Sequence, residues 1–217
     1  MNLKGEPPEQ FGPVRSWLYR KVAEPALRPL YLRIGSEIPF EEGRLLDVGC
    51  GPGRLDRALA ASRPELHVVG LDSSAAMIRQ ARRGPQLPNL SFREMSVEAA
   101  GFRREFDFAL AVLTFHHWEE PVAGLDAVYR ALKPGGRFWI YEPNAESSRE
   151  DLRLDQDPLW GWLQMPLSLQ RRAMRRHGFT LDEMQSVVLP AVAESPFASG
   201  VISQRGSTLR LELERAA

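Results

Sequence analysis

The feature of this chain that most constrains its fold is a glycine-rich turn between an apolar run and a helix-forming run. Residues 45–53 read LLDVGCGPG, so the acidic Asp47 is followed by glycines at positions 49, 51 and 53. Glycine adopts positive φ without steric cost and lets a ligand approach the backbone closely. A strand that turns into a helix through such a loop therefore indicates a ligand site at that turn.

Apolar runs and helical segments alternate after this turn. Nearly continuous apolar strands separated by helices indicate a parallel sheet that is covered on both faces. We therefore predict a doubly wound α/β fold with a seven-stranded, mostly parallel sheet, whose last strand is antiparallel and paired with a C-terminal neighbour. The expected strands are residues 45–48, 66–71, 90–95, 106–113, 137–141, 184–189 and 208–213, and the expected helices are residues 54–62, 74–83, 122–132 and 170–177.

The ends of the chain differ from this alternating centre. A length of 217 residues fits one domain with an appendage, since domains usually hold roughly 100–200 residues. We predict an N-terminal helical cap over residues 1–38, a main domain over residues 39–217, and a lid or insert over residues 143–170. Trp160 and Trp162 lie in that insert, where they fit either an acceptor pocket or ordinary core packing.

Charge and cysteine content restrict the partners and the compartment. Lys and Arg number 28, as do Asp and Glu, so the formal net charge is zero. Nucleic-acid binders obtain much of their affinity by neutralising phosphates with basic side chains. Because this chain has no basic excess, we do not expect a nucleic-acid partner. The single cysteine, Cys50, excludes an intrachain disulfide. No segment has the apolar length of a signal peptide core or a membrane span, so we expect a cytoplasmic protein without a transmembrane segment.

The glycine turn has one close competitor, the dinucleotide-binding fingerprint Gly-x-Gly-x-x-Gly. That pattern requires a third glycine at position 54, which is Arg54 here. The carboxylate of Asp47 also suits a ligand that bears an ammonium group better than it suits a pyrophosphate. Asp72 follows the next expected strand, 19 residues after Gly53, at the spacing where an acidic residue commonly binds ribose hydroxyls. Asp72 could instead cap the helix that follows.

Together these residues resemble the class I S-adenosylmethionine-dependent methyltransferases, in their small-molecule branch. Residues 106–110, FDFAL, and residues 132–137, LKPGGR, extend the resemblance, which covers about residues 40–142. It implies a Rossmann-like methyltransferase domain over residues 39–217, with S-adenosylmethionine as donor and S-adenosylhomocysteine as product. The cofactor-binding residues that the resemblance implies are Asp47, Gly49, Cys50, Gly51, Gly53, Asp72, Ser73, Met77, Ser96, Val97 and Ala111.

One position departs from the family's pattern. Relatives usually carry Gly-Asp-Ala-Glu after the third strand, and this chain has Met95, Ser96, Val97 and Glu98 there. The usual aspartate accepts a hydrogen bond from the adenine amino group, and a neutral hydroxyl makes that bond about half as strong. We expect the backbone N–H of Val97 to face the adenine ring.

The acceptor side is predicted from the segment that follows the fourth strand. Residues 114–121 read TFHHWEEP, and they would lie at the carboxyl edge of the sheet, near the methyl donor. Histidine is the natural general base near neutral pH when the acceptor carries a proton that must leave. We name His116, His117 and Glu142 as candidate catalytic residues, with loop packing for the histidines and a solvated strand end for Glu142 as the alternatives.

We therefore predict an enzyme that transfers a methyl group from S-adenosylmethionine to a small-molecule acceptor. We expect no metal, because the chain has no helical His-x-x-x-His pair and no cysteine cluster. One alternative is a regulatory protein on the same fold that binds S-adenosylmethionine without turnover. Another is a methyltransferase that acts on protein or RNA. Nothing in the sequence identifies the acceptor or the oligomeric state.

Overall fold

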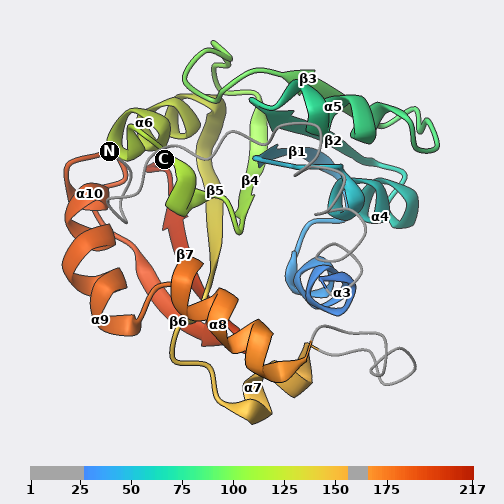
Figure 1. Ribbon diagram of the computed structural model, residues 1–217. Helices are drawn as coiled ribbons and strands as arrows, with labels where there is room; N and C mark the ends of the chain where they lie inside the picture. The colour runs from blue at the N-terminus through green and yellow to red at the C-terminus, as the bar shows by residue number, and fades with distance from the viewer. Residues whose placement is uncertain (1–26, 156–165) are drawn as a thin grey trace.

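A seven-stranded sheet forms the centre of the computed structural model, which describes residues 27–155 and 166–217 (Figure 1). The strand order is β3-β2-β1-β4-β5-β7-β6. The first five strands in this order run parallel, and β7 is antiparallel to both β5 and β6. The strands are β1 (Gly43–Val48), β2 (Leu66–Asp72), β3 (Leu90–Glu94), β4 (Phe106–Val112), β5 (Leu132–Pro143), β6 (Val201–Arg205) and β7 (Thr208–Glu214). This confirms the predicted fold class.

Helices cover both faces of the sheet (Figure 1). None of those in the described part of the chain is long and apolar enough to cross a membrane. They are α3 (Arg28–Glu37), α4 (Arg54–Ser62), α5 (Ala75–Arg82), η2 (Phe115–His117), α6 (Pro121–Ala131), α7 (Arg149–Leu154), α8 (Leu167–His177), α9 (Leu181–Glu183), η3 (Met184–Val188) and α10 (Leu189–Ala193).

Alternating side chains of the strands build two separate cores. Leu45 of β1 packs with α3 and α4 on one face, whereas its neighbour Leu46 packs with α6 and α10 on the other. The same alternation places Phe108 and Ala109 of β4 in different cores. Because both faces are covered, the central strands are apolar nearly throughout, as the sequence predicted.

The strand order reverses at β1, which has β2 on one side and β4 on the other. Ligands of such sheets bind beyond the carboxyl ends of the strands at this switch point. The turn after β1 and the turn after β4 therefore meet at the edge where the site is expected.

The predicted strand over residues 184–189 is wrong, because this segment is helical. Met184, Val188 and Val192 are fully buried at intervals of four residues, which is the spacing of one helix face. A capping box of Thr180 and Glu183 starts the helix just before them. A short β-branched run resembles a strand in a sequence, and here the local cap and the core contacts favour a helix.

The partner of β7 is instead β6, in a stretch that the sequence analysis treated as a linking segment. β6 is an edge strand with one bonded neighbour, and none of its five residues is buried. Its pattern therefore lacks the apolar alternation that identifies a half-buried strand. Gly206, at φ 54°, forms the turn that joins β6 to β7.

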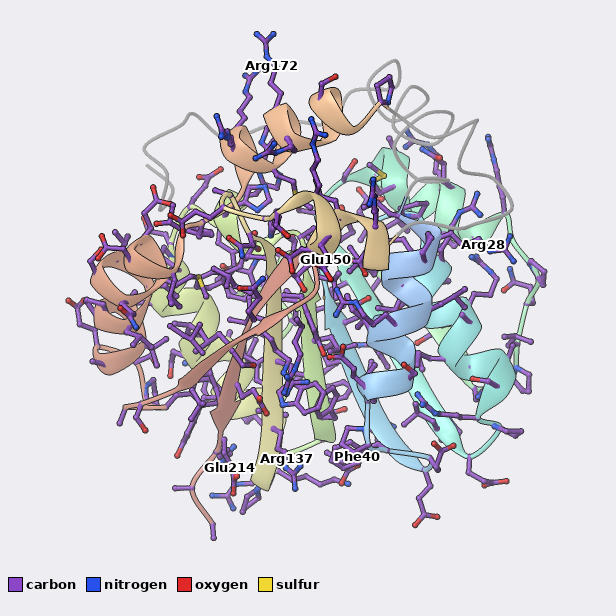
Figure 2. All side chains as sticks on the ribbon, turned by 90° about the horizontal axis from the view of Figure 1, so that it is seen from below. Arg28, Phe40, Arg137, Glu150, Arg172 and Glu214 are labelled. Atoms are coloured by element: carbon purple, nitrogen blue, oxygen red, sulfur yellow. The ribbon has the colours of Figure 1, made fainter. Side chains whose placement is uncertain are left out.

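Two other elements extend beyond their predicted limits. β5 begins at Leu132 rather than at residue 137, and its pairing with β4 shifts between Phe106 and Phe108. The basic helix predicted over residues 170–177 spans residues 167–177 as α8. Arg172, Arg175 and Arg176 are exposed, and Arg172 points away from the body of the protein (Figure 2). These cations form a solvated outer face of the helix.

Charged side chains hold α3 against the C-terminal half. Arg33 Nε lies 2.7 Å from Asp155 Oδ1, and Arg210 Nη1 lies 3.0 Å from Glu37 Oε2. The Tyr141 hydroxyl also donates to Glu37 Oε2 over 2.8 Å. Of the helical cap predicted over residues 1–38, the structure describes the part from residue 27 onward. Trp160 and Trp162 of the predicted lid lie outside the described residues.

Candidate active site

The turns after β1 and β4 are in close contact at the switch point. A Cβ atom on Gly49 would lie 2.2 Å from Thr114 Oγ1, so no side chain fits at this position. The backbone N–H groups of Gly49 and Cys50 both donate to the carbonyl of Leu71, at 2.7 and 2.9 Å. The glycine turn is thereby fixed to the ends of β2 and β4 without any help from its own side chains.

All three glycines of the turn have positive φ, at 81° for Gly49, 54° for Gly51 and 71° for Gly53. Gly53 lies against Phe92, because a Cβ there would be 2.3 Å from the ring. Gly51 differs from both, since a Cβ there would meet nothing within 4 Å. The turn therefore packs tightly on its inner side and leaves open space beside Gly51, which fits a backbone-lined ligand site.

Asp72 at the end of β2 links the glycine turn to the next helix. Its Oδ2 accepts from the N–H of Gly51 at 2.9 Å, and its Oδ1 accepts from the N–H of Ser74 at 2.8 Å. Ser74 caps α5 by accepting from Met77 N. Burial raises the pKa of Asp72, and the two backbone bonds partly offset that rise. A carboxylate has about four acceptor positions, so Asp72 retains the capacity to bind hydroxyl groups.

A second carboxyl lies beside Asp47, and the sequence analysis did not select it. Asp56 on the first turn of α4 is fully buried, and Asp47 is 3% exposed. The negative charge of Asp56 raises the pKa of Asp47 further, beyond the rise that burial causes. The signal was available in the sequence, because Asp56 interrupts the apolar face of a helix that follows a ligand-binding turn.

The thiol of Cys50 in the turn packs against the end of β2. Its Sγ lies 2.8 Å from the place where a Cβ on Gly70 would stand, and it donates weakly to the Gly51 carbonyl. Burial, reinforced by the charges of Asp56 and Asp47, raises the pKa of the Cys50 thiol well above its ordinary value. The thiolate form is therefore scarce near neutral pH, which excludes a role as an activated nucleophile.

The residues expected near the adenine lie on two neighbouring turns. Ser73 and Ser96 are exposed, at the carboxyl ends of β2 and β3. Met77 is buried in α5, and the side chain of Ala111 is fully buried in the core of β4, so only its main chain can contact a ligand.

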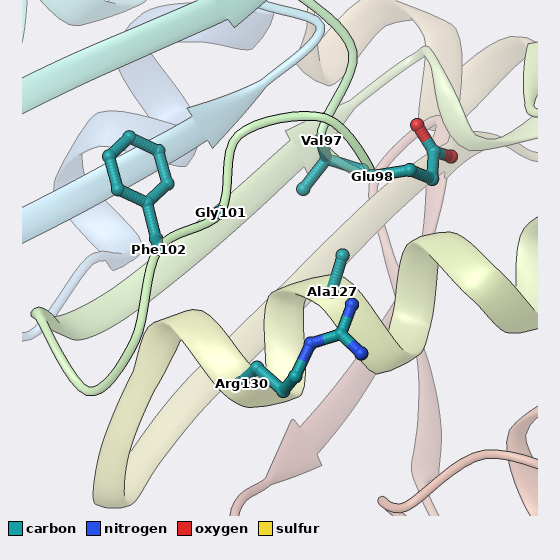
Figure 3. A pocket seen from close by; sticks show the side chains of 6 residues that line it. All are labelled: Val97, Glu98, Gly101, Phe102, Ala127 and Arg130. Atoms are coloured by element: carbon teal, nitrogen blue, oxygen red, sulfur yellow. The ribbon is translucent and has the colours of Figure 1, made fainter.

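The side chain of Val97 is directed toward α6. Together with Phe102 it faces Ala127 and Arg130 of α6 across a small hollow (Figure 3). Its backbone N–H makes no hydrogen bond to any residue that the structure describes. That the main chain of Val97 meets the adenine ring stays a prediction.

The turn after β4 is built around a buried histidine–carboxylate pair. His116 Nδ1 lies 2.6 Å from Glu142 Oε2, and the N–H of Phe115 donates to Glu142 Oε1 at 2.7 Å. Glu142 is fully buried and His116 is 5% exposed. Leu113 adopts φ 55°, a conformation that costs a non-glycine residue about 1–2 kcal/mol, and this strain turns the chain from β4 into η2.

The second histidine, His117, is not paired with Glu142 in the same way. Its ring centroid lies 3.9 Å from that of His116, and the ring of His177 from α8 lies 5.9 Å from His116. The fold thus brings a third histidine to this turn that the sequence analysis did not select. Among the residues that the structure describes, no group of three His, Cys, Asp or Glu side chains has a metal-binding arrangement.

Comparison with known proteins finds similarity to methyltransferases. A sequence model described as "Methyltransferase domain" matches residues 46–140. The chain is 35% identical over 133 residues to trans-aconitate 2-methyltransferase from Methylobacterium nodulans, covering 58% of this chain and 48% of that protein. It is 32% identical over 124 residues to the S-adenosyl-L-methionine-dependent Diels-Alderase iccD of Talaromyces variabilis, covering 52% of this chain and 42% of that protein.

The fold is also shared with solved structures. A crystal structure of an S-adenosylmethionine-dependent methyltransferase from Aquifex aeolicus aligns with a TM-score of 0.66 at 17% identity, covering 94% of this chain and 99% of that one. The chain spans about half the length of the curated relatives named above. The sequence similarity to the family model ends near the carboxyl end of β5, so the segments after residue 140 are the part that the family does not describe.

Proposed function

We propose that this chain is a class I S-adenosylmethionine-dependent methyltransferase, which transfers the methyl group of S-adenosylmethionine to a small-molecule acceptor. The observation that carries this proposal is the glycine turn at the switch point. Its Gly51 borders open space and donates its N–H to Asp72. A nucleoside amino acid matches such a site, since it offers an ammonium group to a carboxylate-rich turn and ribose hydroxyls to an acidic strand end.

The residues around the turn divide into two sets in this proposal. Main-chain groups of the glycine turn and the carboxyl of Asp47 would hold the methionine part of the donor. Asp72 would hold the ribose, while Ser73, Met77, Ser96 and the Val97 N–H would border the adenine. The bound donor supplies a methyl group that its sulfonium already activates, so the protein contributes chiefly by positioning.

On the acceptor side we assign His116 as the general base and Glu142 as the residue that positions it. A carboxylate that accepts from Nδ1–H fixes the tautomer in which Nε2 is the basic nitrogen. Glu142 is fully buried and also accepts from the N–H of Phe115, so it orients the turn rather than binding a cationic acceptor. A base at this place would remove the proton of a hydroxyl or another protic acceptor.

We propose that the methyl acceptor is a small molecule, and the names of the relatives support this acceptor class. The name of the Methylobacterium relative specifies trans-aconitate, a small organic acid. One alternative also has a specific observation in its favour: the Talaromyces relative is named for a Diels–Alder reaction, so relatives within this family serve chemistry other than methyl transfer. Ser96, in place of the usual aspartate, is compatible with such a change of role.

A turnover assay with radiolabelled S-adenosylmethionine tests the proposal. A panel of small hydroxy, carboxylic and amino compounds would be compared for transfer by the unaltered protein, His116→Gln and Glu142→Gln. We expect a drop in kcat of about 10²–10⁴-fold for His116→Gln with donor affinity unchanged. Transfer by His116→Gln at the unaltered rate would contradict the assignment of the base. Donor binding without transfer to any compound in the panel would favour the alternative.

A further inference from the structure

Two carboxyl groups are buried together beneath the glycine turn with no cation assigned to them. Asp47 at the end of β1 is 3% exposed, and Asp56 in α4 is fully buried. No N–H or hydroxyl of the described residues donates in hydrogen-bonding geometry to either oxygen of Asp56 or to Oδ1 of Asp47. Burying charged groups without partners is costly, so this pair needs a physical explanation.

The explanation within the free protein is a shared proton. Two adjacent carboxyl groups can hydrogen-bond to each other only when one of them is protonated. Two carboxyl groups that lie close together in a buried site cannot both ionise readily, because their negative charges repel. Burial raises the pKa of Asp56 to about 7. Burial and the negative charge of Asp56 raise the pKa of Asp47 well above its ordinary value. Near neutral pH the pair therefore keeps at least one proton.

The titratable groups around the pair are Asp72, Cys50 and Arg57. Asp72 at the end of β2 adds negative charge, and the Cys50 thiol stays neutral because its own pKa is raised. Arg57, one residue after Asp56, lowers the pKa of Asp56. Arg57 donates from Nη1 to the Gly53 carbonyl and from Nη2 to the Ala81 carbonyl, and neither oxygen of Asp56 has a hydrogen-bond partner among the described residues. The negative charge of the carboxyl groups around the turn is therefore not fully neutralised by Arg57.

The position of the pair places it next to the ligand space. Asp47 is separated from the turn's first glycine by one residue, and Asp56 Oδ1 lies 3.0 Å from where a Cβ on Gly70 would stand. Asp72, whose charge acts on both carboxyls, donates no proton and holds the N–H of Gly51. A cation that binds at the turn would therefore be attracted by all three carboxyl groups.

We propose that Asp47 and Asp56 share one proton in the ligand-free protein and release it to solvent when the ammonium-bearing donor binds at the glycine turn. The inference rests on the proposed function. Asp56 is then a positioning residue that sets the charge of Asp47, and the affinity for the donor rises with pH up to about 7. No covalent bond changes, and the proton lost by the pair is gained by the buffer.

Calorimetry with S-adenosylhomocysteine at pH 6 in two buffers of different ionisation enthalpy measures the proton directly. At this pH the ligand's α-amino group, with a pKa of roughly 7.7–8.0, is already protonated, so a released proton comes from the protein. A group with a pKa of about 7 is then mostly protonated, and we expect release of about 0.9 proton per ligand bound. Binding with no proton release at pH 6 overturns the inference.

Asp56→Asn is the matched variant, because its amide can donate to Asp47 and leave that carboxyl ionised. We expect no proton release from this variant at pH 6. When the pH falls from 8 to 6, the affinity of the unaltered protein for S-adenosylhomocysteine should fall about tenfold relative to that of Asp56→Asn. A single group with a pKa of about 7 requires a change of this size. Asp126→Asn, at an exposed carboxylate of α6, should behave as the unaltered protein does.

The outcomes separate this inference from the function on which it rests. Failure of S-adenosylhomocysteine and S-adenosylmethionine to bind at any pH contradicts the proposed function and with it the inference. Binding with equal pH dependence in Asp56→Asn and the unaltered protein contradicts the inference alone. A purely structural role for Asp56 would weaken binding of the variant at every pH, whereas we expect the variant to bind more tightly than the unaltered protein at pH 6. The calorimetry of the unaltered protein decides the matter even if the variant does not fold.

Discussion

The two sides of this molecule use charge in opposite ways. On the side of the glycine turn, Asp47, Asp56 and Asp72 are at least partly buried, and no ion pair of any of them is found among the described residues. On the side of α3 and β7, buried charges are paired, as in Arg33 with Asp155 and Arg210 with Glu37. Unpaired carboxyls mark the side that we assign to a cationic ligand, and paired charges hold α3 against Asp155 and β7.

The largest expected effect breaks the glycine turn itself. Gly49→Ala places a Cβ 2.2 Å from Thr114 Oγ1 at φ 81°, and we expect a loss of about 3 kcal/mol in the free energy of unfolding. Gly51→Ala is the matched variant, because its Cβ enters open space and costs only about 1 kcal/mol of backbone strain. Denaturant titration measures both losses, and calorimetry should show weaker donor binding for Gly51→Ala. Equal stability losses would contradict the contrast.

Removing Asp72 tests the ligand side next. Bound ligand at a hundredfold excess over Kd stabilises a protein by about 2.7 kcal/mol, and Asp72→Ala should abolish this gain with S-adenosylmethionine. The carboxyl that would hold the ribose is then absent, and the N–H of Gly51 loses its acceptor. Glu214→Ala, at an exposed end of β7, serves as the control in the same melting experiment. A retained ligand shift in Asp72→Ala would exclude the ribose assignment.

Breaking a pair on the other side should affect stability alone. Arg33→Met removes the partner of Asp155, which is 8% exposed, and we expect a loss of about 2 kcal/mol because the remaining carboxylate keeps only its bonds from Ser207. Donor affinity should not change, since Arg33 contacts α7 and β7 and not the glycine turn. Calorimetry that finds weakened donor binding in Arg33→Met would show that the two sides are coupled.

The unpaired carboxyls should also appear in the pH dependence of stability. A carboxyl whose pKa is higher in the folded state than in the unfolded state stabilises the fold while it is protonated, and that contribution is lost as pH rises through the folded pKa. For Asp56, with a folded pKa of about 7, we expect the ligand-free protein to lose about 1 kcal/mol between pH 6 and pH 8. Denaturant titrations of Asp56→Asn should lack this loss, and a loss of equal size in both proteins would assign it elsewhere.

The two sides also differ in how far the sequence predicted them. Around the glycine turn, local residues dictate the structure: the positive φ of Gly49 and the serine cap of α5 were both expected from residue type. The predicted helix over residues 54–62 matches α4. Asp56 was missed there, because its complete burial follows from the packing of α4 on α3, β2 and β3.

Beyond β5 the structure depends on contacts between distant segments, which a sequence pattern does not reveal. β6 forms because β7 offers it an edge, and residues 184–189 are helical because the core beside α6 accepts one helix face. His116 and Glu142 were both selected from the sequence, but their 2.6 Å contact joins residues 26 positions apart. His177 reaches the same turn only through the placement of α8.

The claim on which the whole account depends is that the glycine turn binds S-adenosylmethionine and not a dinucleotide. Thermal melting of the unaltered protein with S-adenosylmethionine, S-adenosylhomocysteine or NAD tests it most directly. At a hundredfold excess over Kd, we expect the first two ligands to raise the Tm by about 5–10 °C and NAD to leave it unchanged. A rise with NAD and none with either S-adenosyl compound would contradict the account.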